Sequence, residues 1–549
     1  MKQRTVIIVA ALAVIALIVA GLALWSVNAR TRSVLAVHAD LISDPHKRGA
    51  LIFYGDDFGG LSATSLQTHA LPWKLSAAAI VYAAHQRDPS LPVDHDELIR
   101  QLRGFGFFTP ARIGNWPKAL TPVPSTLPLG MTHGDLEVMP GFPVEVSNLG
   151  CAACHAGVTY RADGTPDTDQ AWLGAPNTSL NLEAYTGAVY QGYVAGMRDP
   201  DGLMRTVKAL FPHISGAEMF SLRYLVLPRV RSRLHELEGQ GRALPFPNGS
   251  PGATNGVAAL KMMLHVPMQG GGRDETGFTS IPDLGDRTLR TSLLYDGAYA
   301  PVGDTRQAAL TPAQVTPGHV AALAEIATFF SVPSMGVKPE ATLKNADKAK
   351  AVFAFLDIYH APPFPGVIDA ASARRGQGIY ASQCASCHGI YDGSLDRPRL
   401  TAFPNWIGDV GTDPARAHAF SPELAAAVAK TPYRGVIDAQ STGKYVAVPL
   451  SGLWSSAPYL HNGSVPTLMA LLTPQARPRQ FLVGGHRLDY RTVGIDLTPN
   501  GGYPTGYRPW STPQRLDTTK PGLSNAGHTY GSALTPRQKQ DLISYLKLL

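Results

Sequence analysis

The chain has 549 residues, of which 44% are hydrophobic and 16% charged, a composition that allows a large buried core and excludes a disordered protein. Glycine (54 residues) and proline (45 residues) are abundant, which indicates a loop-rich fold. The net charge of +7 is small for this length and no basic run is interleaved with aromatic residues, so we expect no nucleic-acid partner.

Residues 1–26 are predicted to be a membrane anchor or a signal segment. Residues 6–25 form an unbroken apolar run that follows Lys2 and Arg4 and is long enough to span a bilayer as a helix. Positive charge before the run favours a cytoplasmic N-terminus and an exported remainder. The length favours an anchor in the inner membrane, whereas Val27-Asn28-Ala29 would permit cleavage and release into the periplasm. Either outcome predicts a periplasmic protein.

Apolar periodicity and helix-start residues predict five helices in the remainder of the chain. These predicted helices cover residues 75–86, 317–330, 346–359, 370–380 and 536–546. Thr316 is suited to the N-cap of the second helix, and Pro317 to its first turn. Pro362, Pro363 and Pro365 then interrupt helix formation and predict a hinge.

All four cysteines fall into two copies of one motif. The copies are Cys151-Ala152-Ala153-Cys154-His155 and Cys384-Ala385-Ser386-Cys387-His388. Two thiols at this spacing can each add to a vinyl group of one haem, and the adjacent histidine then ligates the iron. A zinc site would need four ligands, a thioredoxin-like dithiol would not require histidine after both pairs, and a disulfide this local would cross-link almost nothing. The sequence therefore predicts two covalently bound haem c groups, with His155 and His388 as iron ligands.

A helix before a haem motif and another at the end of its domain is the cytochrome c arrangement. We therefore predict a mainly α fold with two cytochrome c-like haem domains and loop-rich extensions, preceded by one N-terminal transmembrane helix. The predicted divisions are the anchor or signal segment (1–26), an N-terminal extension (27–140), the first haem domain (141–345) and the second haem domain (346–549).

Several segments of the second half resemble a known group of haem proteins. Residues 457–468 (Ala-Pro-Tyr-Leu-His-Asn-Gly-Ser-Val-Pro-Thr-Leu) are similar to a segment shared by the bacterial di-haem cytochrome c peroxidases and their relatives. Residues 411–416, Arg477-Pro478 and residues 524–528 resemble the branch that contains the di-haem rubber oxygenases. The resemblance implies two packed cytochrome c domains, an open and reactive first haem, and a six-coordinate second haem that passes electrons.

The remaining ligands are assigned partly from this resemblance. His461 and His528 are the candidates for the second axial ligand of the second haem, and the rubber-oxygenase-like branch selects His528. The family places the segment of His461 in the haem surroundings, so we expect His461 in the second coordination sphere. The first haem has no comparable candidate, because His265, Met262 and Met263 are residues that more often serve packing.

Residues 293–297 (Leu-Leu-Tyr-Asp-Gly) echo residues 459–463, so Tyr295 would stand where His461 stands in a duplicated domain. Phe278 and Tyr295 are predicted to line the distal pocket of the first haem. Tyr295-Asp296 takes the place of the Trp-Asp pair of the rubber-oxygenase relatives, which argues against polyisoprene as the substrate. Glu275 and Asp283 could move protons for oxygen–oxygen cleavage, or be solvated loop acids.

These residues predict an oxidoreductase in which the first haem activates peroxide or dioxygen and the second relays electrons. Its expected partners are that oxidant, a reductant or organic substrate, a redox partner protein and the membrane around the N-terminal helix. The alternative is a non-catalytic di-haem electron-transfer cytochrome that serves a dehydrogenase or a respiratory chain.

Overall fold

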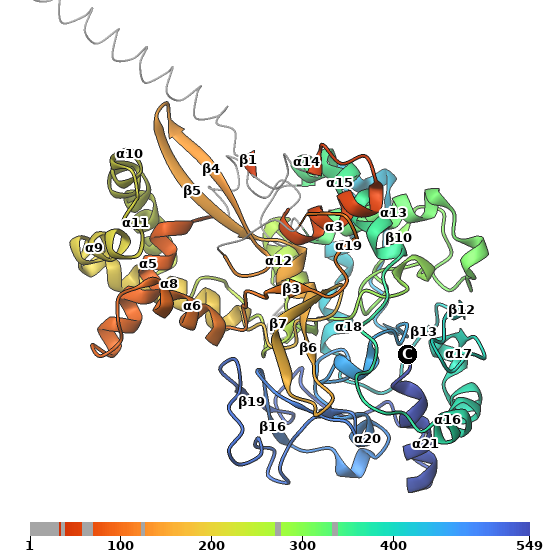
Figure 1. The fold of residues 1–549 in the computed structure, drawn as a ribbon. Helices are drawn as coiled ribbons and strands as arrows, with labels where there is room; N and C mark the ends of the chain where they lie inside the picture. The colour runs from red at the N-terminus through yellow and green to blue at the C-terminus, as the bar shows by residue number, and fades with distance from the viewer. Residues whose placement is uncertain (1–31, 34–38, 57–69, 122–126, 269–275, 332–338) are drawn as a thin grey trace, which may run out of the picture.

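The structure is a computed structural model that describes residues 32–33, 39–56, 70–121, 127–268, 276–331 and 339–549 (Figure 1). The predicted membrane segment, residues 1–26, lies outside these residues. None of the helices in the described ranges is both long enough and apolar enough to cross a bilayer.

A lobe of helices forms one end of the molecule, on the left of Figure 1. At its centre is α5 (Trp73–Arg87), which packs against both α8 (Leu182–Arg198) and α9 (Pro200–Leu210). Small alanines on α5 let these helices approach closely. The other helices of the lobe are α6 (His95–Gly104), α10 (Gly216–Phe220) and α11 (Leu227–Glu236).

A long β-hairpin connects this lobe to the first cysteine motif. Its strands are β4 (Met131–Met139) and β5 (Phe142–Leu149), joined by a turn at Gly141, whose φ of 75° favours glycine. With β1 (Arg32–Ser33) and β2 (Leu71–Pro72) they form an antiparallel sheet in the order β1-β4-β5-β2. The predicted domain boundary after residue 140 falls in this hairpin turn.

The first cysteine motif lies in the chain between this sheet and a second sheet. α7 (Cys151–His155) is followed without a break by β6 (Ala156–Tyr160), which pairs with β7 (Pro166–Leu173). β3 (Arg112–Ile113) completes a sheet of order β3-β7-β6. The motif is therefore held between a strand that ends at Leu149 and a strand that begins at Ala156.

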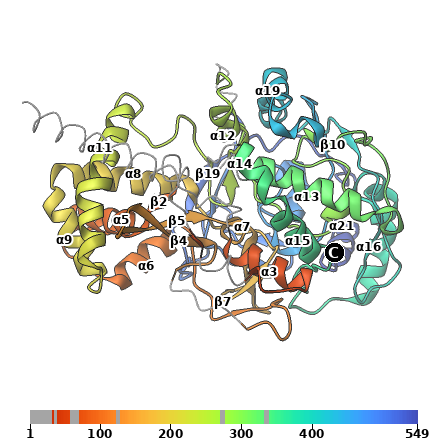
Figure 2. The ribbon, with the colours of Figure 1, turned by 90° about the horizontal axis from the view of Figure 1, so that it is seen from above.

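A second group of helices packs together in the part of the molecule around α13 and α15 (Figure 2). α13 (Pro317–Ser331) packs on α15 (Ala346–Asp357), and α15 packs on α3 (Pro45–Gly55) from the N-terminal region. A Cβ at Gly49 would lie 1.9 Å from the Ala351 carbonyl oxygen, so this close helix contact requires glycine there.

The second motif follows a helix that pairs with the last helix of the chain. α16 (Ala370–Gln383) leads into α17 (Ala385–His388) and packs along α21 (Pro536–Leu546). Arg375 forms two hydrogen bonds to Asp541 across the pair, at 2.8 and 2.7 Å. The shorter helices and 2-stranded pairs are α12 (Gly256–Met263), α14 (Pro339–Thr342), α18 (Ala415–Ala419), α19 (Pro422–Val428), α20 (Leu468–Leu471), β8–β9 (Ala253–Thr254, Thr279–Ser280), β10–β14 (Tyr299–Pro301, Ile437–Ala439), β11–β12 (Ile390–Tyr391, Leu400–Ala402), β13–β15 (Ile407–Gly408, Tyr445–Val446), β16–β19 (Gln480–Val483, Gln514–Asp517) and β17–β18 (Leu488–Asp489, Gly494–Ile495).

The five predicted helices are confirmed as α5, α13, α15, α16 and α21, with α15 ending two residues before the predicted end. The Thr316 hydroxyl accepts the predicted cap hydrogen bond from the His319 amide at 3.1 Å. The prediction of a mainly α fold preceded by a transmembrane helix is wrong, because sheets surround the first motif and no described helix can span a bilayer. Val144 and Val146 are fully buried and alternate with Glu145, a two-residue period that indicates a strand.

Candidate functional site

In the first motif, the imidazole of His155 is held in one tautomer. Its Nδ1 lies 3.1 Å from the carbonyl oxygen of Pro282, an acceptor, so Nδ1 carries the proton. Burial, and then the positive charge of Arg287, lower the pKa of His155 to about 4, which keeps the ring neutral. The other ring nitrogen, Nε2, is therefore an unprotonated donor for a metal.

The second motif repeats this support. The Nδ1 of His388 donates to the carbonyl oxygen of Val448 at 2.9 Å, and burial lowers the pKa of the ring. None of the four cysteines forms a disulfide in the part of the chain that the structure describes, and burial raises the pKa of Cys154 to about 12 and that of Cys384 to about 11. Two thiols followed by a histidine whose Nε2 lacks a proton are the groups that a covalently attached haem requires.

His528 lies opposite His388. The two ring centres are 6.1 Å apart, and the Nδ1 of His528 is buried without a hydrogen-bond partner. Two imidazoles that coordinate one metal from opposite sides, with metal–nitrogen distances of about 2.0 Å, have ring centres about 6 Å apart. The pair therefore fits a metal ion between the rings, and the residues present fit a haem held by His388 and His528.

The segments that resemble the rubber-oxygenase branch meet around His528. The amide of His528 donates to the Val410 carbonyl oxygen at 2.7 Å, and Arg477 donates to the carbonyl oxygens of Gly527 and His528 at 2.8 and 3.1 Å. A Cβ at Gly527 would lie 2.2 Å from the Gly411 backbone, so the close approach of the two loops requires glycine at position 527. Residues far apart in sequence thus fix the loop that carries His528.

His461 is placed differently. It is buried, its ring stacks on that of Tyr445 at 4.2 Å, and its Nε2 lies 3.0 Å from the Tyr445 hydroxyl. Burial and then Arg416 lower the pKa of His461 to about 3, so the ring is neutral. The Nε2 of His461 is thus engaged by Tyr445, and its place in the second coordination sphere stays a prediction.

Pro282 and Val448, whose carbonyl oxygens bind His155 and His388, begin two segments that share one backbone pattern. Leu294 and Gly297 have left-handed φ values of 68° and 61°, and Leu460 and Gly463 have 65° and 66°. A short 3-10 helix precedes each pair, and one isolated β-bridge closes each turn, Leu293 with Tyr299 and Tyr459 with Val465. Left-handed leucine is uncommon, so its recurrence at matching positions indicates a duplicated structure.

The two copies of this duplicated structure, one around Tyr295 and the other around His461, contact each other through reciprocal backbone hydrogen bonds. The Ser280 amide donates to the His461 carbonyl oxygen at 2.7 Å. The Val446 amide donates to the Tyr295 carbonyl oxygen at 2.8 Å. Tyr295 therefore occupies in the first copy the place that His461 occupies in the second, as the echo between the two sequences predicts.

The predicted distal residues of the first haem lie in or near this duplicated region. The Tyr295 hydroxyl is 3.1 Å from the Ser280 hydroxyl, and burial raises its pKa. Phe278 is buried beside Gly249, where an added Cβ would lie 3.1 Å from its ring. Of the alternatives, His265 is exposed and Glu275 lies outside the described residues.

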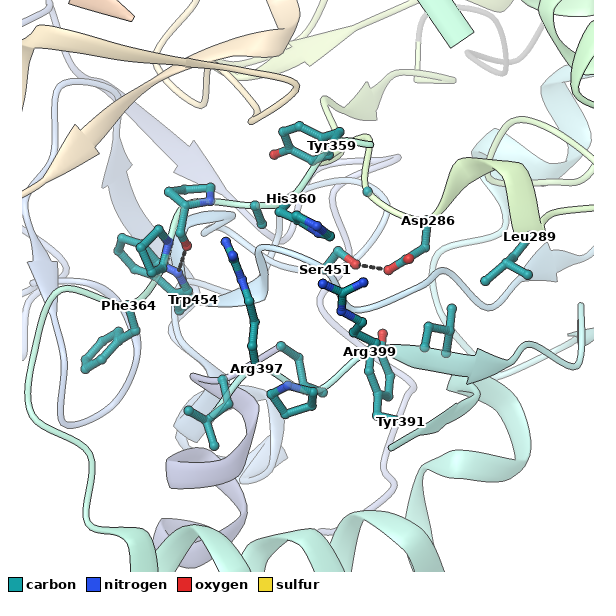
Figure 3. Close-up of a pocket in the computed structure, with 18 of the residues that line it drawn as sticks. Asp286, Leu289, Tyr359, His360, Phe364, Tyr391, Arg397, Arg399, Ser451 and Trp454 are labelled. Carbon is teal, nitrogen blue, oxygen red and sulfur yellow. Dashed lines mark hydrogen bonds between the residues drawn. The ribbon is translucent and has the colours of Figure 1, made fainter. Parts of the chain in front are cut away.

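A buried polar network joins the two copies. Asp283, the residue after Pro282, accepts a hydrogen bond from the Tyr359 hydroxyl at 2.8 Å, and burial raises its pKa to about 7. The Ser451 hydroxyl donates to the Asp286 carboxylate at the wall of a cavity (Figure 3). Asp283 is therefore not a solvated loop acid. The supporting carbonyl groups and this network were not predicted, because partners so distant in sequence leave no local pattern.

Comparisons with known proteins support haem binding at the second motif. The family described as cytochrome C oxidase, cbb3-type, subunit III, matches residues 371–436, which contain that motif. The family described as RoxA-like, cytochrome c-like, matches residues 443–482, which contain Tyr445 and His461. The chain thus contains cytochrome c domains related to the RoxA-like group, and covalently bound haem c and a haem-based redox function follow.

Two curated proteins of Sinorhizobium fredii, the uncharacterized proteins y4iJ and y4iM, are each 31% identical to the chain over the aligned parts. The alignment covers 34% of this chain and 40% of y4iJ, and 35% of this chain and 52% of y4iM. The chain therefore spans about half or less of the length of these relatives.

Proposed function

We propose that this protein is a periplasmic di-haem c-type oxidoreductase of the di-haem peroxidase type, with one haem at each motif. His388 and His528 would together hold one haem, which would supply electron relay. His155 would hold the other haem, which would supply a place for peroxide or dioxygen to bind. The observation that carries this proposal is the asymmetry between the two histidines: His388 has an imidazole opposite it, whereas no ring contact among the described residues gives His155 such a partner.

Haem c supplies one-electron redox chemistry and, where a coordination position is open, a binding place for a small oxidant. The carbonyl groups of Pro282 and Val448 fix the orientation of the two ligating rings. The reciprocal hydrogen bonds of the duplicated segments keep the two supports in contact. This short, rigid connection favours electron transfer between the two sites.

Tyr295 and Phe278 are the residues that we assign to the pocket of the reactive haem. Burial raises the pKa of Tyr295, so its hydroxyl keeps its proton and is able to donate a hydrogen bond to an oxidant. Phe278 would limit access of water. The electrons come from an organic reductant or a redox partner protein.

A second candidate is an electron-transfer cytochrome in which protein ligands occupy both faces of each iron. The match of residues 371–436 to an oxidase subunit family favours it. Both candidates share the haem sites and differ only in the face opposite His155.

Ligand-binding spectroscopy of the full-length haem-loaded protein distinguishes the two candidates. The pyridine haemochrome assay should give two haems per chain. Cyanide on the oxidised protein and carbon monoxide on the reduced protein should each change the spectrum of one haem and leave the other low-spin. Two low-spin haems that respond to neither ligand would eliminate the enzyme and leave the electron-transfer protein.

A further inference from the structure

A cavity of about 860 Å³ is lined by residues from both predicted haem domains (Figure 3). Its walls come from residues 285–289, 356–364, 391–400, 451–454 and the last residues of the chain. None of the motif cysteines or their histidines lines it. A volume in this range is typical of pockets that hold small organic molecules.

Basic side chains line this cavity, and Arg397, Arg399 and His360 are each exposed to solvent. Figure 3 shows the side chains of Arg397 and Arg399 extending into it, on the side where His360 lies. Neither guanidinium forms an ion pair with a carboxylate of the described residues. The pKa of His360 is lowered first by burial and then by the charges of Arg397 and Arg399, which places the three basic groups close to one another. An anion between them would relieve this repulsion.

The acidic residues of the lining do not supply that anion. Asp286 already accepts a hydrogen bond from Ser451, and Asp357 and Asp396 are exposed at the rim without a described ion pair. A guanidinium group binds a carboxylate through two parallel hydrogen bonds, and two guanidiniums can bind both faces of one oxyanion.

The other wall of the cavity is apolar and aromatic. Phe364 and Trp454 form an edge-to-face pair with ring centres 5.6 Å apart, and the Trp454 indole N–H is fixed by the Pro362 carbonyl oxygen at 2.9 Å. The ammonium group of Lys547 lies 5.0 Å from the centre of the Phe364 ring. A ligand that matches both walls has an anionic end and an apolar body.

We propose that this cavity binds a small organic carboxylate, with its oxyanion between Arg397 and Arg399 and its apolar part against Phe364 and Trp454. Asp286 and Ser451, which join the segments that support His155 and His388, line the same cavity. The ligand therefore lies where it is able to influence both supports. The proposal goes beyond the proposed function, because binding does not depend on the reactivity of either haem.

Isothermal titration calorimetry on the full-length haem-loaded protein tests the proposal, with benzoate as the organic probe and inorganic phosphate as the purely polar probe. Benzoate should bind at one site per chain. Each of Arg397→Gln and Arg399→Gln should weaken binding about tenfold or more, because each removes a charge-assisted contact. Arg374→Gln is the matched control, since Arg374 is an exposed arginine of the same region that does not line the cavity.

Absence of benzoate binding, or equal binding by the Arg397→Gln, Arg399→Gln double variant, would overturn the proposal. Phosphate binding as tight as benzoate binding would overturn the proposal that Phe364 and Trp454 bind an apolar part of the ligand. The absorption spectrum of each variant should match that of the wild type. This readout separates failure at the cavity from failure at the haems.

Discussion

The segments 282–299 and 448–465 have the same backbone but different surroundings. Asp296 and Asn462 follow the equivalent residues Tyr295 and His461, and both are fully buried. Asp296 forms a buried ion pair with Arg416, with a distance of 2.5 Å. The amide of Asn462 instead donates to the carbonyl oxygens of Gly522 and Ser524, at 3.1 and 3.0 Å.

This difference gives the two copies different long-range partners. In the second copy, the neutral amide holds the loop that leads to His528. In the first copy, the carboxylate of Asp296 at the equivalent position binds Arg416 of the second region, and this ion pair joins the two regions. Each copy supports one motif histidine through a backbone carbonyl oxygen, and we propose that the faces opposite these histidines differ. The following experiments test that comparison.

Loss of one motif should remove one haem and leave the other. The double variant Cys151→Ser, Cys154→Ser should fall from two haems per chain to one in the pyridine haemochrome assay, because the remaining thiols belong to a separate site. The matched double variant Cys384→Ser, Cys387→Ser should also retain one haem. Retention of two haems by either variant would contradict one haem per motif.

His528→Ala should convert the low-spin haem of the second region to a high-spin haem without loss of haem. The ring opposite His388 is removed, while the thioether attachments are untouched. Electron paramagnetic resonance measures the spin state directly. His461→Ala is the control, because its Nε2 binds Tyr445, and it should keep the low-spin signal. An unchanged spectrum in His528→Ala would show that another group is the ligand.

Asp296→Asn should destabilise the protein by about 3–5 kcal/mol, because it leaves the buried charge of Arg416 unpaired. Chemical denaturation followed by circular dichroism gives the free energy of unfolding. The double variant Asp296→Asn, Arg416→Met should recover part of this loss, since it removes both charges. A single variant as stable as the wild type would show that the ion pair does not connect the regions.

The sequence predicted the local features of the sites and missed the long-range ones. The spacing of Cys384, Cys387 and His388 is a local chemical requirement, and helix α16 before it follows from apolar periodicity. The echo between Tyr295 and His461 was visible because the duplicated turn needs glycine two residues later. In contrast, the carbonyl groups of Pro282 and Val448 carry no side-chain signal, since any residue supplies a backbone oxygen.

The strands around the first motif were missed for a different reason. Residues 131–149 contain polar residues on both faces, so the alternation is clear only at Val144 and Val146. Helix signals elsewhere, such as the N-cap at Thr535, depend on one or two residues and are easier to recognise. Sheet formation depends instead on partners such as β2, which lies far away in the chain.

The buried carboxyl group of Asp283 gives the first region a pH dependence for which the second region has no counterpart, since the residue after Val448 is Pro449, which does not titrate. Burial raises the pKa of Asp283 to about 7 in the folded protein, whereas an unfolded aspartate has a pKa of about 3.9. The folded state therefore binds the extra proton between about pH 4 and pH 7. The free energy of unfolding should be highest below this window and fall as the pH rises through it, by up to about 1.4 kcal/mol per pH unit.

Asp283→Asn removes this titration and keeps an acceptor for the Tyr359 hydroxyl. The groups that face Asp283 are Tyr359, Arg287 and Asp286, and Asp286 contributes a slope of the same sign because burial also raises its pKa. Denaturation at several pH values between 4 and 7 should therefore show a flatter profile for the variant than for the wild type. Parallel profiles would mean that the folded protein holds Asp283 ionised, and the first region would then match the second in its response to pH.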